Sequence, residues 1–110
     1  MTELEFYQQL DSIAEALKKQ PEIMAEMQHP KYALDFRQAV RNSLKTGKPC
    51  LYIECVCPDV PAAPLASAEI ALDVSVDALT EDEVLRKYTP LMVKIMKSMS
   101  MQLGQELDQL

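Results

Sequence analysis

Three cysteines are the residues of this chain best suited to metal or redox chemistry. Cys50, Cys55 and Cys57 follow the spacing C-x4-C-x-C. A structural zinc site needs four converging ligands, and paired cysteines usually stand two to four residues apart. Because the segment alternates like a strand, Cys50 would face away from Cys55 and Cys57. We therefore expect no metal site and no cofactor, and we expect the thiols to be small buried packing residues.

Catalytic constellations are absent from the sequence. The single histidine, His29, stands before Pro30 at a predicted corner, where we expect a partly exposed side chain. A nucleophilic triad would need a serine or cysteine, a histidine and an acid that converge, and no G-x-S-x-G motif provides that setting. The chain has two glycines and neither of the glycine-rich nucleotide-binding motifs. We therefore expect that the protein is not an enzyme.

The acidic residues are better suited to a solvated surface than to acid–base catalysis. Glu69, Asp73 and Asp77 share one face of a predicted strand, with neighbours about 13 Å apart. That spacing exceeds the roughly 5–9.5 Å between the catalytic carboxyl groups of glycosidases. The net charge is −6, and the sequence from Glu54 to Glu83 holds eight acids and no base. Such a surface repels phosphate backbones and anionic lipids, which favours a protein partner over nucleic acid or membrane.

The first half of the chain carries helix signals. Thr2 and Glu5 have the spacing of a capping box, which predicts a helix over residues 3–18. Pro21 and Pro30 each suit the first turn of a further helix. The pattern predicts a short helix over 21–29 and a third over 31–45, ended by Gly47 in a left-handed conformation.

Two segments alternate with the period of a strand. Residues 50–57 form the first predicted strand, and residues 67–76 form the second, with apolar side chains on one face only. A two-stranded sheet is marginal and leaves two open edges. We therefore expect a homodimer that joins two copies into a four-stranded sheet, or else a third strand within residues 59–65.

A long amphipathic helix closes the chain. Thr80 and Glu83 predict its start, and Pro90 predicts a kink or a break. One methionine-rich stripe recurs at helical spacing and is longer than a two-stranded sheet requires, so we expect it to cover the sheet and also to bind a partner. The candidate partner-binding residues are Met92, Ile95, Met96, Met99, Leu103 and Leu107.

These features predict one α+β domain over residues 1–110, with a helical N-terminal half, a small antiparallel sheet of two to three strands and the C-terminal helix. No signal peptide and no apolar run of about 20 residues is evident, so we expect a cytoplasmic protein with free thiols. We expect a protein-interaction module, such as a small adaptor, chaperone or regulator. The alternative is a ligand-binding domain that holds a small molecule between sheet and helix near Tyr52, Cys55 and Cys57.

Overall fold

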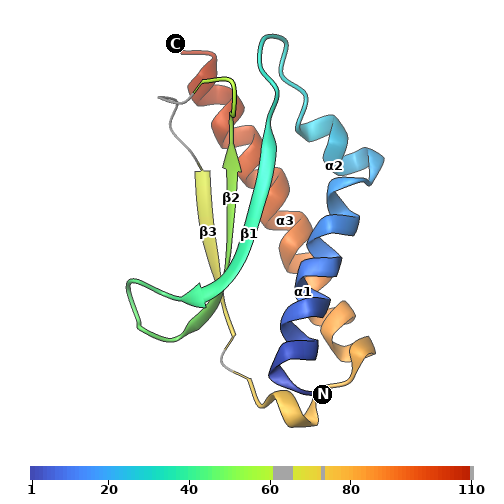
Figure 1. Ribbon diagram of the computed structural model, residues 1–110. Helices are drawn as coiled ribbons and strands as arrows, with labels where there is room; N and C mark the ends of the chain where they lie inside the picture. Colours follow the sequence, from blue (N-terminus) through green and yellow to red (C-terminus); the bar gives the residue numbers. More distant parts are fainter. Residues whose placement is uncertain (61–65, 73, 110) are drawn as a thin grey trace.

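Helices lie at both ends of the chain, and a three-stranded antiparallel sheet lies between them (Figure 1). The computed structural model describes residues 1–60, 66–72 and 74–109. The predicted α+β class is confirmed. The elements, in order, are α1 (Glu3–Lys18), α2 (Pro21–Glu26), β1 (Asp35–Asn42), β2 (Pro49–Val56), β3 (Ala66–Ala71), a 3-10 helix η1 (Val76–Ala78) and α3 (Glu81–Leu107).

Helix α1 begins at the predicted capping box. The Glu5 N–H donates to Thr2 Oγ1 at 3.1 Å, and the Thr2 N–H donates to Glu5 Oε1 at 3.2 Å. These bonds satisfy backbone donors that the first turn leaves without a helical partner. The predicted apolar stripe is buried: Phe6, Leu10, Ile13 and Leu17.

The predicted third helix over residues 31–45 is wrong, because the chain from Asp35 to Asn42 forms strand β1. Phe36 and Val40 are four residues apart, a spacing that fits one face of a helix and also one face of a strand. Pairing with β2 decides between these two patterns. Gly47 has the expected positive φ of 71°, but it turns the β1–β2 hairpin rather than ending a helix. Its N–H donates to the Ser43 carbonyl at 2.8 Å.

Strand β2 is the centre of the sheet, with β1 and β3 as its edges. Ile53 lies opposite Gln38 of β1 and Ala68 of β3. Strand β3 ends at Ala71, five residues before the predicted end at position 76, and the chain then turns into η1. The sheet's third strand is therefore β1, which lies in the segment predicted to be a helix. Within 59–65, residues 59 and 60 are not in a strand, and 61–65 lie outside the described residues.

Helix α3 is continuous from Glu81 to Leu107 and contains Pro90, so the predicted break is absent. Thr80 caps its start, where Thr80 Oγ1 accepts the Glu83 N–H at 3.3 Å. A proline in a helix interior costs about 3 kcal/mol. Burial of large side chains on both sides of Pro90, among them Tyr88 and Met92, offsets that cost.

The helices cover one face of the sheet, and no helix of the described residues covers the other, which is the open face. Figure 1 shows α3 crossing behind the strands and α1 running alongside β1, on the side away from β2. Alternate strand residues face the helices and are buried there: Phe36, Leu51, Ile53, Cys55, Ala66 and Ile70. The residues between them lie on the open face.

Candidate functional site

The outer edge of β1 carries backbone groups that no described strand pairs. The Ser43 N–H donates to the Lys48 carbonyl at 2.8 Å, which makes this a hydrogen-bonded pair. Hydrogen-bonded and non-bonded pairs alternate along an antiparallel ladder. The β1 residues that bond to β2 are therefore Asp35, Arg37, Ala39 and Arg41. The N–H and C=O groups of the residues between them point to the open edge: Phe36, Gln38, Val40 and Asn42.

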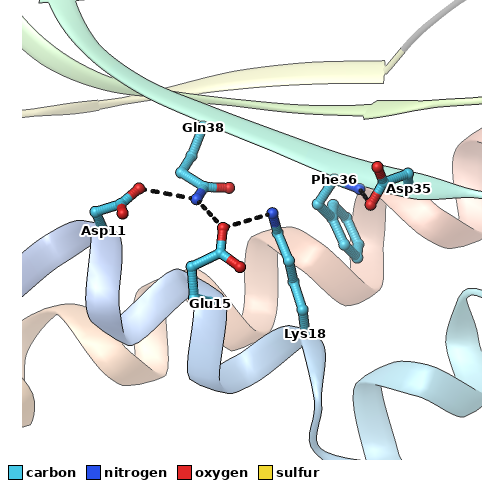
Figure 2. Close-up of polar contacts among 6 residues, drawn as sticks. All are labelled: Asp11, Glu15, Lys18, Asp35, Phe36 and Gln38. Atoms are coloured by element: carbon cyan, nitrogen blue, oxygen red, sulfur yellow. Dashed lines mark hydrogen bonds and ion pairs between the residues drawn. The ribbon is translucent and has the colours of Figure 1, made fainter.

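One of these groups has a local partner. The Phe36 N–H donates to Asp35 Oδ1 at 2.8 Å, as expected for an amide that does not face β2 (Figure 2). No described residue of another element bonds to the outward groups of Gln38, Val40 and Asn42. Unpaired strand edges are templates for pairing with another extended chain.

A groove of about 630 Å³ runs between this edge and α1. Its apolar surface comes from Tyr7 and Val40, which are partly buried, and from Leu51, which is buried. The α1 wall adds the polar residues Gln8, Asp11 and Ser12. The groove therefore has an open row of backbone groups on one side and a helix on the other.

The side chain of Gln38 links β1 to α1 beside the groove. Its Nε2 donates to Asp11 Oδ1 at 2.9 Å and to Glu15 Oε1 at 2.8 Å, while Lys18 Nζ donates to Glu15 Oε1 at 3.1 Å (Figure 2). The bond from Gln38, with the help of Lys18, lowers the pKa of Glu15. Gln38 Oε1 is buried and has no hydrogen-bond partner among the described residues. An unpaired buried acceptor is costly, so a donor entering the groove would be stabilised there.

The open face beside β1 carries two arginines, whereas the α1 wall is acidic. Arg37 is exposed, and its Nη1 lies 4.0 Å from Glu54 Oε1 of β2. Arg41 stacks over the ring of Tyr52 at 3.8 Å from its centroid. The Tyr52 hydroxyl donates to Glu54 Oε2 at 2.7 Å, and this bond, with burial, raises the pKa of Tyr52. The two sides of the β1 edge therefore differ: the open face offers arginines with acids beside them, whereas α1 offers the acids Asp11 and Glu15.

The structure does not bring the three candidate ligand-binding residues together. Cys55 and Cys57 are buried on the face that meets the helices, whereas Tyr52 lies on the open face. Burial raises the pKa of Cys55 to about 11, which keeps its thiol protonated at neutral pH. All three cysteines, including Cys50 on the open-face side of β2, are buried and unpaired. They are arranged as packing residues rather than as a cluster.

The candidate partner-binding stripe of α3 lies in the core of the single chain. Five of its six side chains are at most 4% exposed, namely Met92, Met96, Met99, Leu103 and Leu107. Ile95 is half-buried. Their role as a partner site stays a prediction, and in this fold their contacts are with the chain's own sheet and helices.

His29 lies where the chain turns towards β1, and it is half-buried at the predicted corner. Its Nε2 lies 2.7 Å from Asp108 Oδ1, and its Nδ1 accepts the Lys31 N–H at 3.1 Å. The ring also stacks on Tyr32. These contacts tie the α2–β1 connection to the end of α3.

Residues 1–60, 66–72 and 74–109 contain no group of three or more histidines, cysteines or acids placed to hold a metal ion. Among the same residues, no helix combines the length and the apolar character needed to cross a bilayer.

Comparison with protein-family models, curated proteins and solved structures finds no match for this chain. No relative therefore informs the function of this protein, and the α+β fold and the geometry of the β1 edge are what a proposal can be built on. The sequence did hold one signal for that edge. Phe36, Gln38 and Val40 alternate with Arg37, Ala39 and Arg41, and a glycine-containing turn separates them from the next strand, as in a hairpin.

Proposed function

We propose that the protein is a non-enzymatic protein-interaction module, an adaptor, chaperone or regulator, that binds an extended segment of a partner as an additional strand on β1. The observation that carries the proposal is the groove between α1 and the free edge of β1. Peptide recognition by strand addition uses main-chain hydrogen bonds for affinity and alternate side-chain contacts for specificity.

Both kinds of contact are available at β1. The outward N–H and C=O groups of Gln38, Val40 and Asn42 can each serve an incoming backbone. Tyr7 and Val40 supply partly buried apolar surface, and α1 supplies polar side chains. Every second residue of the added strand would face α1, and the residues between would face the open side of the sheet.

The experiment is selection of peptides from a random linear library against the purified protein, followed by NMR mapping of the bound sites. The expected peptides shift the amides of Gln38 and Val40 and the residues of α1 that line the groove. Val40→Pro removes an outward N–H and leaves the β2 ladder intact, so it should weaken binding at least about tenfold. Selected peptides that map elsewhere, or that bind Val40→Pro equally well, would overturn the proposal.

A small molecule is the competing occupant, because about 630 Å³ lies within the usual range of ligand pockets. A metabolite that raises the unfolding temperature by several degrees, and that still does so with Val40→Pro, would favour that reading. Strand addition predicts the opposite result, since it depends on the Val40 amide.

We also propose a homodimer through the other edge, β3. The Leu72 N–H donates to the Pro49 carbonyl at 3.1 Å, so by alternation Ser67, Glu69 and Ala71 direct their backbone groups outward. A two-fold axis at Ala68 would place Ser67 of one copy opposite Glu69 of the other, with no like charges opposed. Light scattering at micromolar concentration tests this proposal, and a particle of 12.4 kDa would refute it.

A cytoplasmic location belongs to the same proposal. Cys50, Cys55 and Cys57 are all unpaired and buried. Free thiols are typical of reducing compartments.

A further inference from the structure

We infer that the segment bound at β1 carries opposite charges on its two faces, with basic side chains towards α1 and acidic side chains towards the open face of the sheet. This inference rests on the proposed strand addition and specifies the chemistry of the partner. It follows from the charges on the two sides of the vacant strand position.

The α1 side of that position is acidic and polar. Asp11 lines the groove, and its carboxylate accepts one bond from Gln38, which leaves further acceptor capacity. Gln8 and Ser12, also in the groove wall, carry no charge. Lys18 is the nearest base of α1 in the Gln38 cluster, and it is bonded to Glu15. A lysine or arginine of the partner that faces α1 would therefore meet Asp11 without a competing positive charge in the groove lining.

The open-face side of the same position carries two arginines of β1 and one acid, Asp35, which accepts the Phe36 N–H. Arg37 and Arg41 are exposed and stand on either side of Ala39. Side chains directly opposite one another on neighbouring strands are about 4.5–5.5 Å apart at Cβ, so acidic residues of an added strand would reach these guanidinium groups. Both side chains lie over the central strand, Arg41 on the Tyr52 ring and Arg37 at 4.0 Å from Glu54, so they would turn outwards to meet acids of the added strand.

Strand geometry combines these two preferences into one sequence pattern. Successive side chains of a strand point to opposite faces, so bases and acids must alternate along the partner segment. A shift of one residue exchanges the two faces, and that shift would oppose acid to Asp11 and base to Arg41. The charges therefore select both the pattern and the register.

A second copy of this chain does not have that pattern. Its β1 would present Phe36, Gln38 and Val40 towards α1, which include no base, and Arg37 and Arg41 towards the face that needs acids. The copy would also bring its own α1 alongside the same edge, where Figure 1 shows α1 already in place. The partner at β1 is therefore an extended segment of another protein.

The test uses two labelled nine-residue peptides of identical composition, with lysine, glutamate and threonine. In one peptide the lysines occupy even positions and the glutamates odd positions, and in the other each charge occupies both parities. Fluorescence anisotropy should give the alternating peptide a Kd at least about tenfold lower, which corresponds to about 1.4 kcal/mol. The difference should shrink at high salt, because screening weakens exposed charge pairs.

Matched variants locate the effect. Asp11→Lys makes both sides of the position basic and should weaken the alternating peptide about tenfold, whereas Glu26→Lys makes the same charge change on α2 and should leave the affinity unchanged. Arg41→Glu makes both sides acidic and should weaken the peptide similarly, with Lys45→Glu in the hairpin loop as its control. Circular dichroism establishes that each variant is folded.

The outcomes separate this inference from the proposed function. Equal affinity for the two peptides, or equal loss with Asp11→Lys and Glu26→Lys, overturns the charge pattern. If library peptides of another pattern still bind at β1, strand addition stands without it. If no library peptide binds, both proposals fail. Self-association that Val40→Pro abolishes would instead identify a second copy as the occupant and overturn the inference.

Discussion

The two edges of the sheet differ in length, in charge and in what lies beside them. Strand β1 has eight residues and an exposed pair of arginines, and a groove separates it from α1. Strand β3 has six residues, half of them alanine, and its inward side packs on α3. Edges are usually protected by charge, by shortness or by cover.

Each edge is therefore protected against unwanted strand pairing in a different way. Arg37 and Arg41 discourage β1 from pairing with a second β1, yet they leave its backbone open to a strand of complementary charge. Strand β3 is short, and its outward residues Ser67, Glu69 and Ala71 are small or singly charged. In the proposed function, β1 binds a different protein, whereas β3 pairs with a second copy of this chain.

Among these variants, proline at an edge-strand residue whose N–H donates to β2 should lower the free energy of unfolding the most. Ala39→Pro and Ala68→Pro each remove an N–H that donates to β2 and leave a β2 carbonyl without its donor. We expect each to lower the free energy of unfolding by about 3 kcal/mol in urea denaturation. Val40→Pro and Ser67→Pro remove outward N–H groups and should cost less than half as much. Equal losses for Ala39→Pro and Val40→Pro would show that the assignment of the β1 edge is wrong.

Raising the pH should weaken both edges together, because both pair with β2. Burial raises the pKa of Cys55 from an ordinary value of 9.0 to about 11. Between these values the unfolded chain releases the thiol proton and the folded chain keeps it. The unfolded state then binds fewer protons, so stability falls by about 1.4 kcal/mol per pH unit, or about 3 kcal/mol in total. Below pH 9 this stability is fully present.

Urea denaturation from pH 8 to 11 measures this loss, and Cys55→Ala is the comparison variant. Burial also raises the pKa values of Cys50 and Tyr88, so part of the slope should remain in the variant. An identical slope in the variant and the original protein would contradict the assignment to Cys55. Cys55 lies opposite Phe36 of β1 and Ala66 of β3, so one transition for both edges is expected.

The elements with local signals were predictable from the sequence, and the edges were not. Thr2 and Thr80 mark helix starts through their own hydrogen bonds, and residues 50–57 alternate over a full strand length. Strand β1 was mistaken for a helix because Phe36 and Val40 fit both periods, and only pairing with β2 excludes the helix. Pro90 was expected to kink or break α3. The helix continues because its apolar side chains are buried against the rest of the fold, and a local pattern does not reveal this tertiary packing.

The candidate site was predictable in one respect only. In a strand, Tyr52 points to the opposite face from Cys55 and Cys57. The alternation in the sequence therefore already argued against one ligand site formed by all three. The groove, by contrast, depends on where α1 lies relative to β1. Asp11 and Gln38 are 27 residues apart in sequence, and nothing local indicates that their side chains bond.

Prolines at the outward residues should separate the functions of the two edges. Val40→Pro should weaken peptide binding at least about tenfold, or about 1.4 kcal/mol, and leave the mass in light scattering unchanged. Ser67→Pro should shift a dimer towards the 12.4 kDa monomer and leave peptide affinity unchanged. If Val40→Pro also dissociates a dimer into monomers, the assignment of self-association to β3 is wrong.

Helix caps give the smallest expected effect and the finest comparison. Thr2→Ala removes the hydroxyl of a reciprocal capping box at α1, and Thr80→Ala removes the Thr80 cap of α3. Each should lower the free energy of unfolding by about 1 kcal/mol in urea denaturation, and serine at either position should restore it.

Their effects on peptide binding should differ, because only α1 forms a wall of the groove. Fraying of the first turn of α1 in Thr2→Ala loosens Tyr7 and Gln8, so we expect peptide affinity to fall about twofold, on the order of 0.4 kcal/mol. Thr80→Ala should leave that affinity unchanged despite its similar cost in stability. Equal effects of the two variants on peptide binding would mean that general stability, rather than the α1 wall, governs the β1 edge.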